Sequence, residues 1–150
     1  MKIGMILDAI YPSDARVTNE CEELIKNGHE IYLFCLSYQK NYIKSEIIND
    51  IKVRRYYCSS LIYKLSALAN DFPFYSISMK SKIKDFVLKN SIDKVHIHDI
   101  QIAKAAVAVC RKYNLKYVLD LHENRHEIMK SYKHVNSFFG KIFISVKRWK

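Results

Sequence analysis

Short apolar runs alternate with amphipathic stretches along this 150-residue chain. An apolar run with little polar interruption is typical of a strand that is covered on both faces. Apolar residues spaced three or four positions apart indicate one face of a helix. The alternation of the two patterns predicts a parallel sheet whose strands are connected by helices. Strands are expected at 2–7, 30–36, 51–57, 94–98 and 116–121.

The first predicted helix has clear signals at both ends. Ser13 or Asp14 can accept hydrogen bonds from its first backbone N–H groups. Gly28 can adopt the left-handed conformation that often closes a helix. The apolar stripe between these ends is Val17, Cys21, Leu24 and Ile25. The sequence therefore predicts a helix that packs one face on the sheet.

Three more helices follow from the same spacing rule. They are expected from Pro73 onward, over 100–113 and from about 135, and the irregular segment 58–72 includes a short helix around 61–68. We therefore expect one α/β domain over 1–150, with a Rossmann-like, doubly wound, mostly parallel sheet and helices on both faces.

The net charge of +10 is unevenly distributed. Positive charge attracts nucleic acid, acidic lipid headgroups or phosphorylated substrates. No acidic residue follows Glu127, whereas six basic residues do: Lys130, Lys133, Lys141, Lys147, Arg148 and Lys150. The predicted helix over 135–150 is therefore basic and amphipathic, and it either packs on the domain's own core or docks on an anionic membrane surface. Nucleic acid is not an expected partner.

Cysteine spacing and hydropathy indicate in which compartment of the cell the protein is expected. The four cysteines are widely spaced with no CxxC pair, which favours reduced thiols in a core over a redox or metal role. The apolar N-terminus is interrupted by Asp8 and lacks a small-residue cleavage site. No apolar run approaches the roughly 20 residues that span a bilayer. We expect a cytoplasmic protein, with any membrane contact at the inner surface.

Polar residues follow three of the predicted strands. The segments are 8–16 after the first strand, His98 and Asp99 after the fourth, and 122–125 after the fifth. Carboxyl ends of parallel strands meet at one edge of a sheet, where open α/β domains bind ligands. Arg16 is notable because the positive end of a helix dipole disfavours a cation. It either pairs with Asp8 or Asp14, or faces an anion together with free backbone N–H groups of the helix.

The histidines raise the question of a metal. His96 and His98 share one side of a strand. We expect His96 to be a hydrogen-bonded core residue and His98 to belong to the site, and no third metal ligand is evident nearby. Residues 122–126 match the HExxH pattern of zinc peptidases, but that pattern requires a helix. Since 117–121 has the character of a buried strand, a solvated loop or another site is favoured there, and no metal is expected.

Three segments together resemble a known family. They are Asp-Ala-Arg-Val-Thr-Asn-Glu (14–20) with Leu-Ile-Lys-Asn-Gly-His-Glu-Ile (24–31), then Asp-Lys-Val-His-Ile-His-Asp (93–99), then Tyr-Val-Leu-Asp-Leu-His-Glu (117–123). In this order they resemble the N-terminal domain of the glycosyltransferase family 4-like proteins, whose opening reads D-x-R-V…E…L…G-H-E-V and whose later segments read D-x-V-H-x-H-D and D-x-H-E. The region 40–92 matches only in outline.

The resemblance implies a two-domain GT-B glycosyltransferase that retains anomeric configuration and uses no metal or other cofactor. Most donor contacts in such enzymes come from a C-terminal domain. The hallmark of that domain, two glutamates separated by seven residues near the donor site, is expected to be missing because the chain ends before it. We therefore expect 1–150 to be the acceptor-side half, inactive by itself, with the donor-binding domain absent from the chain. The expected partners are a nucleotide sugar and a glycan or lipid-linked acceptor, in cell-surface polysaccharide synthesis.

The resemblance also suggests residue roles. His122 would contact the transferred sugar or support its transition state, and Arg16 would meet negative charge from the acceptor or the diphosphate. Glu123 and Asp99 would orient hydroxyl groups or the histidine. The predicted substrate-binding residues are Asp14, Arg16, His98, Asp99 and Glu123. The family's glycine-rich first loop is replaced by 9–13, which has no glycine, so close backbone approach to a diphosphate is not expected there.

Two other function classes remain open. A non-catalytic α/β binding or signalling module would fit the same fold. A receiver-type signalling domain, however, needs an acidic cluster after the first strand, and only Asp8 meets that requirement. A zinc peptidase acting through 122–126 is the third interpretation. A typical NAD-binding or P-loop domain is disfavoured, because neither glycine-rich phosphate loop occurs.

Overall fold

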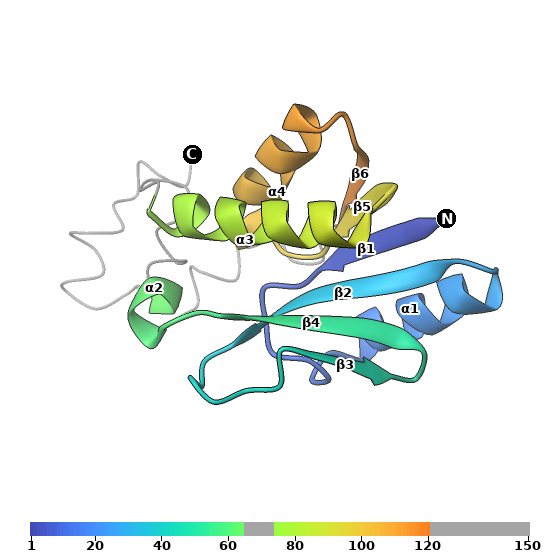
Figure 1. The fold of residues 1–150 in the computed structure, drawn as a ribbon, viewed down its shortest axis with the longest axis horizontal. Coiled ribbons are helices and arrows are strands. Elements are labelled where there is room, and N and C mark those ends of the chain that lie inside the picture. The colour runs from blue at the N-terminus through green and yellow to red at the C-terminus, as the bar shows by residue number, and fades with distance from the viewer. Residues whose placement is uncertain (65–73, 121–150) are drawn as a thin grey trace, which may run out of the picture. The chain divides into compact units, whose positions relative to one another are not determined.

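The computed structural model describes residues 1–64 and 74–120. Contacts divide the chain into two units, Met1–Asp120 and Leu121–Lys150, and the described residues all belong to the first. Within them, six strands form one sheet in the order β3-β4-β2-β1-β5-β6. All strand pairs are parallel except β3 with β4. The predicted Rossmann-like, mostly parallel sheet is confirmed (Figure 1).

The element boundaries agree closely with the sequence pattern. The strands are β1 (Lys2–Ile6), β2 (Glu30–Ser37), β3 (Ser45–Ile48), β4 (Ile51–Tyr57), β5 (Lys94–Ile97) and β6 (Lys116–Leu119). The helices are α1 (Ala15–Lys26), α2 (Ser60–Lys64), α3 (Phe74–Asn90) and α4 (Ile100–Lys112). The expected short helix around 61–68 corresponds to α2, while the helix predicted from about 135 lies outside the described residues. Strand β3 was not predicted.

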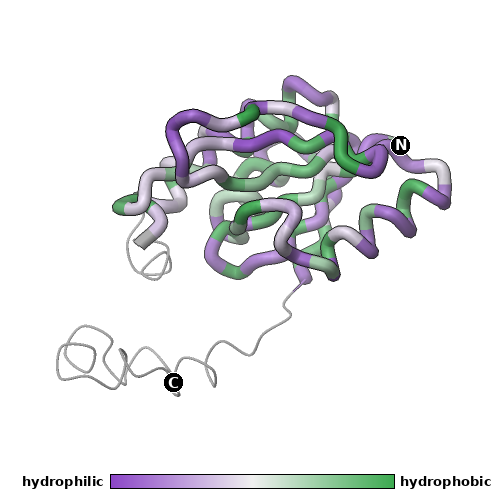
Figure 2. Tube along the Cα trace, turned by 90° about the horizontal axis from the view of Figure 1, so that it is seen from below, coloured by the Kyte–Doolittle hydropathy of each residue, from purple (hydrophilic) through white to green (hydrophobic). Residues whose placement is uncertain are grey.

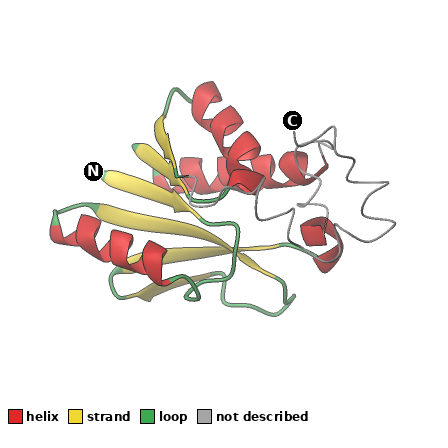
Figure 3. Cartoon of the chain, turned by 180° about the vertical axis from the view of Figure 1, so that it is seen from behind, coloured by secondary structure: helices red, strands yellow, loops and turns green. Residues whose placement is uncertain are grey.

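Alternate residues of the inner strands pack into two separate apolar layers. In β2, Leu33 and Cys35 pack in one layer with Val17 and Cys21 of α1. Phe34 and Leu36 pack in the other layer with residues of α3 and α4. Figure 3 shows α1 on one side of the sheet and α3 with α4 on the other, and Figure 2 shows the hydrophobic residues concentrated in the central strands. The doubly wound arrangement is therefore confirmed.

The close approach of α3 to the sheet depends on a glycine in β1. A Cβ atom on Gly4 would lie 3.0 Å from Cγ2 of Ile92 and 3.1 Å from Cε1 of Phe86. Both distances are shorter than ordinary van der Waals contact, so a side chain here would force Ile92 and Phe86 to shift by a few tenths of an ångström. The four cysteines are all buried and free, and burial raises the pKa of the Cys21 thiol to about 12. Their predicted role as core residues is confirmed.

Helices α1, α3 and α4 end in the same way. After each helix the chain passes through one residue with positive φ, namely Gly28 (77°), Ser91 (52°) and Asn114 (53°). The next residue donates its N–H back to a carbonyl five positions earlier, as His29 does to Leu24 at 3.1 Å. This is the Schellman motif. Asn49 and Asp50, with φ of 48° and 63°, join β3 to β4 in the geometry of a type I′ turn.

Because α1 and α3 end in the same way, opposite substitutions at the equivalent positions 28 and 91 test the cost of the left-handed backbone. A residue with a side chain costs about 1–2 kcal/mol in the left-handed conformation, and glycine costs less. We expect Ser91→Gly to raise the free energy of unfolding by about 0.5–1 kcal/mol. Gly28→Ser should lower it by a similar amount, because a Cβ at Gly28 meets no atom within 4 Å and only strain is added. Urea denaturation measures both changes, and a stabilised Gly28→Ser variant would contradict the explanation.

Candidate functional site

The strand order reverses between β1 and β5. Helix α1 leads from β1 to its neighbour β2 on one face, while α3 on the other face precedes β5, the second neighbour of β1. Ligands of open α/β sheets bind beyond the carboxyl ends of the strands at such a switch point. Here the two strand ends are joined, because the backbone N–H of Asp8 donates to Oδ2 of Asp99 at 2.8 Å. The predicted grouping of polar residues at this edge is confirmed for these two segments.

Asp14 holds both the start of α1 and the Arg16 side chain. Its carboxylate accepts hydrogen bonds from the backbone N–H groups of Arg16 at 3.0 Å and Val17 at 3.5 Å. It also accepts from Nε of Arg16 at 3.3 Å and Nη2 at 2.9 Å. Of the two ion-pair partners considered for Arg16, the structure therefore selects Asp14. Asp14 occupies the N–H groups of Arg16 and Val17, so these two groups are not free to face an anion together with the Arg16 side chain.

The charges around Arg16 favour its exposed cationic form. Its side chain is 51% exposed, and hydrogen bonding to Asp14, together with the charges of Asp14, Asp99 and Asp120, raises its pKa. Burial raises the pKa of Asp14, but the hydrogen bond and charge of Arg16 outweigh burial, and the pKa of Asp14 lies below its ordinary value. Arg16 can therefore still present N–H donors to an anion at the carboxyl edge of the sheet.

Asp8 is buried in the core, and Arg16 forms its ion pair with Asp14 instead. It is 5% exposed, and its Oδ1 accepts a hydrogen bond from the hydroxyl of Tyr75 on α3. Burial and the charge of Asp8 raise the pKa of Tyr75. The loop after β1 is anchored by Tyr11, which is buried and whose hydroxyl accepts a hydrogen bond from Thr18 at 3.1 Å. A buried tyrosine thus anchors the loop 9–13, which has no glycine.

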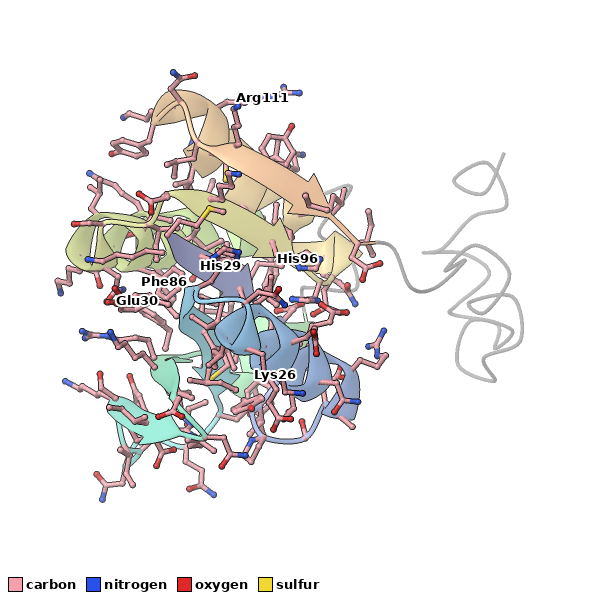
Figure 4. All side chains as sticks on the ribbon, turned by 90° about the vertical axis from the view of Figure 1, so that its right-hand side faces the viewer. Lys26, His29, Glu30, Phe86, His96 and Arg111 are labelled. Carbon is pink, nitrogen blue, oxygen red and sulfur yellow. The ribbon has the colours of Figure 1, made fainter. Side chains whose placement is uncertain are left out.

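His96 and His98 lie on the α1 side of β5, with ring centroids 4.2 Å apart. His98 is buried, with a side chain 1% exposed, whereas His96 is 22% exposed and faces Glu20. Figure 4 shows His96 on β5 beside α1. The interpretation of His96 as the core histidine is therefore wrong, because the deeper position is that of His98. The distance of 3.6 Å from Nδ1 of His96 to Oε2 of Glu20 is longer than a hydrogen bond.

The expectation that no third metal ligand lies near the histidines is also wrong. Glu20 of α1 and Asp120 after β6 lie beside them, and ligand atoms from all four residues are within 4.8 Å of one another. Sequence reasoning missed this cluster because the four residues come from three separate segments. Two features of the sequence could have indicated it. Glu20 is a charged residue directly beside the buried stripe of Val17 and Cys21, and Asp120 comes at the carboxyl end of a predicted strand.

A pocket of about 720 Å³ opens at the same edge of the sheet, beyond β2 and β4. It is lined mainly by the segment between β2 and β3, including Tyr38, Gln39, Asn41 and Tyr42, with Arg55 of β4. Arg55 is held by an ion pair with Glu46 and donates to the carbonyl of Tyr11 at 3.1 Å. This pocket was not predicted from the sequence, because tyrosines and amides between strands also occur in ordinary loops.

Two predicted residues cannot be placed in this site. His122 and Glu123 lie outside the described residues, so their roles stay predictions. The strand character of the segment before them is confirmed by β6, which gives the HExxH match no preceding helical turns. Within the described ranges, no helix is both long and apolar enough to cross a bilayer.

A comparison with known sequences shows to which protein family this chain belongs. The profile of Glycosyltransferase Family 4 matches residues 15–149, from α1 to the C-terminal region. The chain belongs to glycosyltransferase family 4. No curated protein sequence matches it significantly. Membership favours the glycosyltransferase interpretation over the binding module and the zinc peptidase.

Solved structures of low sequence identity share the fold of this domain. Sucrose-phosphate synthase from Thermosynechococcus elongatus superimposes with a TM-score of 0.65 at 12% identity, over 96% of this chain and 39% of that one. The trehalose-6-phosphate structure from E. coli, bound with UDP-2-fluoro glucose, gives 0.60 at 15% identity, over 91% and 36%. The family 4 domain thus spans little more than a third of these chains.

The same fold also occurs outside glycosyltransferases. The C-terminal domain of the PF1911 hydrogenase from Pyrococcus furiosus gives a TM-score of 0.57 at 16% identity, over 80% of this chain and 90% of that one. Architecture alone therefore does not select a chemistry. The assignment to a glycosyltransferase family comes from the sequence profile.

The double role of Asp14 predicts a pH-dependent contribution to stability. Asp14→Ala should cost about 1 kcal/mol at neutral pH, as loss of a helix cap usually does. Asp14→Asn should keep the cap and lose only the ion pair. Because the pKa of folded Asp14 lies below the unfolded value of about 3.9, the ion-pair contribution is present above that pH and is lost as the pH falls through the lower, folded value.

The wild type should therefore be more stable than Asp14→Asn at pH 6, and the difference should shrink toward pH 3. Chemical denaturation at several pH values measures it. A difference that stays constant from pH 6 to pH 3 would show that the carboxylate charge does not contribute.

Proposed function

We propose that the family 4 domain is the acceptor-side half of a retaining hexosyltransferase. The enzyme would move a sugar from a nucleotide-sugar donor to a glycan or lipid-linked acceptor in cell-surface polysaccharide synthesis. The observation that carries the proposal is the family match over residues 15–149. The switch point between β1 and β5, where Asp99 and Arg16 lie, supports it as the place for substrate.

Charge separation in sugar transfer explains the residues proposed for the site. When the bond between sugar and diphosphate breaks, the diphosphate gains negative charge and the sugar ring becomes oxocarbenium-like. Fixed cations and dipoles at these positions stabilise the transition state. Arg16 is an exposed cation held in place by Asp14, so it suits a phosphate or acidic acceptor group. His122 is proposed to hydrogen-bond the transferred sugar, and Glu123 and Asp99 to orient hydroxyl groups or the histidine.

We further propose that the transfer step requires no metal. The negative charge that develops on the diphosphate would be met by Arg16 and by cationic groups of the donor-binding domain. The pocket beyond β2 and β4 supports an acceptor of carbohydrate type. The apolar face of a sugar ring packs well on aromatic side chains, and its hydroxyl groups need the donors and acceptors that Gln39, Asn41 and Arg55 offer there.

Replacement of His122 tests the catalytic role. In the complete enzyme, His122→Ala should lower kcat by roughly ten- to a thousand-fold, the range for loss of one transition-state hydrogen bond. His29→Ala is the matched control, because His29 lies between α1 and β2, at the opposite end of β2 from the site. Release of nucleoside diphosphate from a panel of nucleotide sugars measures turnover.

Two outcomes would contradict this proposal. Unchanged kcat with a lowered Tm in His122→Ala would make the histidine structural. Sugar transfer or hydrolysis above a buffer blank by the 150-residue chain alone would contradict the proposed division of labour, since donor contacts are expected from another domain.

The basic segment 135–150 gives a separate prediction about the acceptor. If the acceptor is lipid-linked, the chain should cosediment with vesicles that contain anionic lipid and not with neutral vesicles, because each Lys or Arg near an anionic surface contributes about 1 kcal/mol. Binding should weaken at high salt, and a chain without 135–150 should not bind. Equal failure on both kinds of vesicle would instead support a helix packed on the domain's own core.

A further inference from the structure

We propose that Glu20, His96, His98 and Asp120 bind one zinc-class divalent metal ion where α1 meets the ends of β5 and β6. The four residues offer two imidazole nitrogens and two carboxylate oxygens within 4.8 Å of one another. The inference rests on these described residues and does not depend on the proposed sugar transfer.

The distances in the cluster are close to those between ligands of one metal. Zinc binds imidazole nitrogen and carboxylate oxygen at about 2.0–2.2 Å, which places tetrahedral ligand atoms about 3.4 Å apart. Oε2 of Glu20 lies 3.6 Å from Nδ1 of His96 and 3.8 Å from Nδ1 of His98. Both separations are too long for hydrogen bonds and only slightly longer than the spacing that a shared metal requires. Small side-chain movements would bring the ligands to bonding distance.

One carboxylate oxygen of Glu20 provides a second, independent indication. Its Oε2 is shielded from solvent and has no hydrogen-bond partner among the described residues. A buried carboxylate oxygen without a partner is costly. The two carboxylates of the cluster carry negative charge that a divalent cation would help to balance, beside Arg16, whose pKa is raised by its hydrogen bond to Asp14 and also by the charge of Asp120.

The backbone of the fold presets the positions of the ligands. His96 and His98 alternate along one strand and therefore project to the same side of the sheet. Asp120 follows the neighbouring strand and donates its backbone N–H to Ile97 at 2.8 Å. Glu20 is held by the turn of α1 that buries Val17 and Cys21. Because each ligand sits on or next to a regular element, the metal would find a largely ordered site.

The chemistry of the ligands selects the kind of metal. Imidazole suits zinc and neighbouring transition metals, whereas magnesium and calcium prefer sites made only of oxygen atoms. The side chain of His98 is buried, while those of His96 and Glu20 are 22% and 34% exposed. An ion can therefore enter the site past His96 and Glu20. Four protein ligands complete a tetrahedron and leave no open position, as in structural zinc sites. The ion would join α1 to β5 and β6 and would take no part in sugar transfer.

The test is zinc binding by the chelator-treated 150-residue chain. We expect one equivalent of zinc by calorimetry and elemental analysis, and a rise in Tm of roughly 10 °C at a free zinc concentration 100-fold above Kd. Cobalt in place of zinc should give the visible absorption of a four-coordinate site. Glu20→Gln and His96→Gln should each weaken zinc affinity by at least ten-fold, as should loss of any one ligand. His29→Gln, outside the cluster, should bind as the wild type does.

Residues 122–126 contain two further histidines, which could also bind zinc. Variants at the two places therefore show which residues hold the metal. One equivalent of zinc retained by a His122→Gln, His126→Gln double variant and lost by His96→Gln would support the proposed site. The opposite pattern would place the metal on 122–126 and overturn it. Lack of binding by the wild type at micromolar zinc would also overturn it, and histidines that titrate as a protonated pair in NMR would then explain the cluster. If His96→Gln fails to fold, zinc retained by the double variant still excludes a site on 122–126, and zinc lost by the double variant overturns the proposal.

Discussion

Strand β1 hydrogen-bonds to β2 and β5 at once, and each of its faces is covered by a different apolar layer. This double constraint fixes the direction in which the chain leaves the strand at Asp8. Since β1 cannot shift along either neighbour without exposing a buried face, the segments after β1 and β5 must lie side by side. The contact between Asp8 and Asp99 is a consequence of that register, and the candidate site is built on it.

The polar residues at this edge are organised by carboxylates. Asp14 holds Arg16, Asp99 accepts from the backbone of Asp8, and Glu20 faces the two histidines. Each carboxylate fixes the position of a group that would otherwise be mobile or electrostatically disfavoured. Arg16 is the clearest case, because its charge opposes the helix dipole and the adjacent Asp14 compensates for it. A positive group can thus stand at the start of a helix and remain accessible to an anionic ligand.

Apolar periodicity was sufficient to predict most of the described fold. The strands at 2–7 and 30–36 follow directly from it, because burial on both faces leaves a strong apolar pattern. The helices around the stripes of α1 and α3 follow from the spacing of their apolar residues. Strand β3 has only four residues and lies at an edge, so its pattern is too weak to detect. For the site, individual strand ends were predictable, but the approach of Glu20 to His96 was not. That contact depends on how α1 crosses the sheet, which no local spacing encodes.

The residues with positive φ in the described chain all precede strands, at Gly28, Asn49, Asp50, Ser91 and Asn114. They therefore lie at the amino ends of β2, β4, β5 and β6, away from the carboxyl edge that carries the candidate site. The two edges should consequently diverge under different selective pressures. Turns at the amino edge can change only among residues that tolerate left-handed backbone, such as glycine and asparagine. Loops at the carboxyl edge are free of that restriction, so new substrate specificities can evolve there without a change in the scaffold.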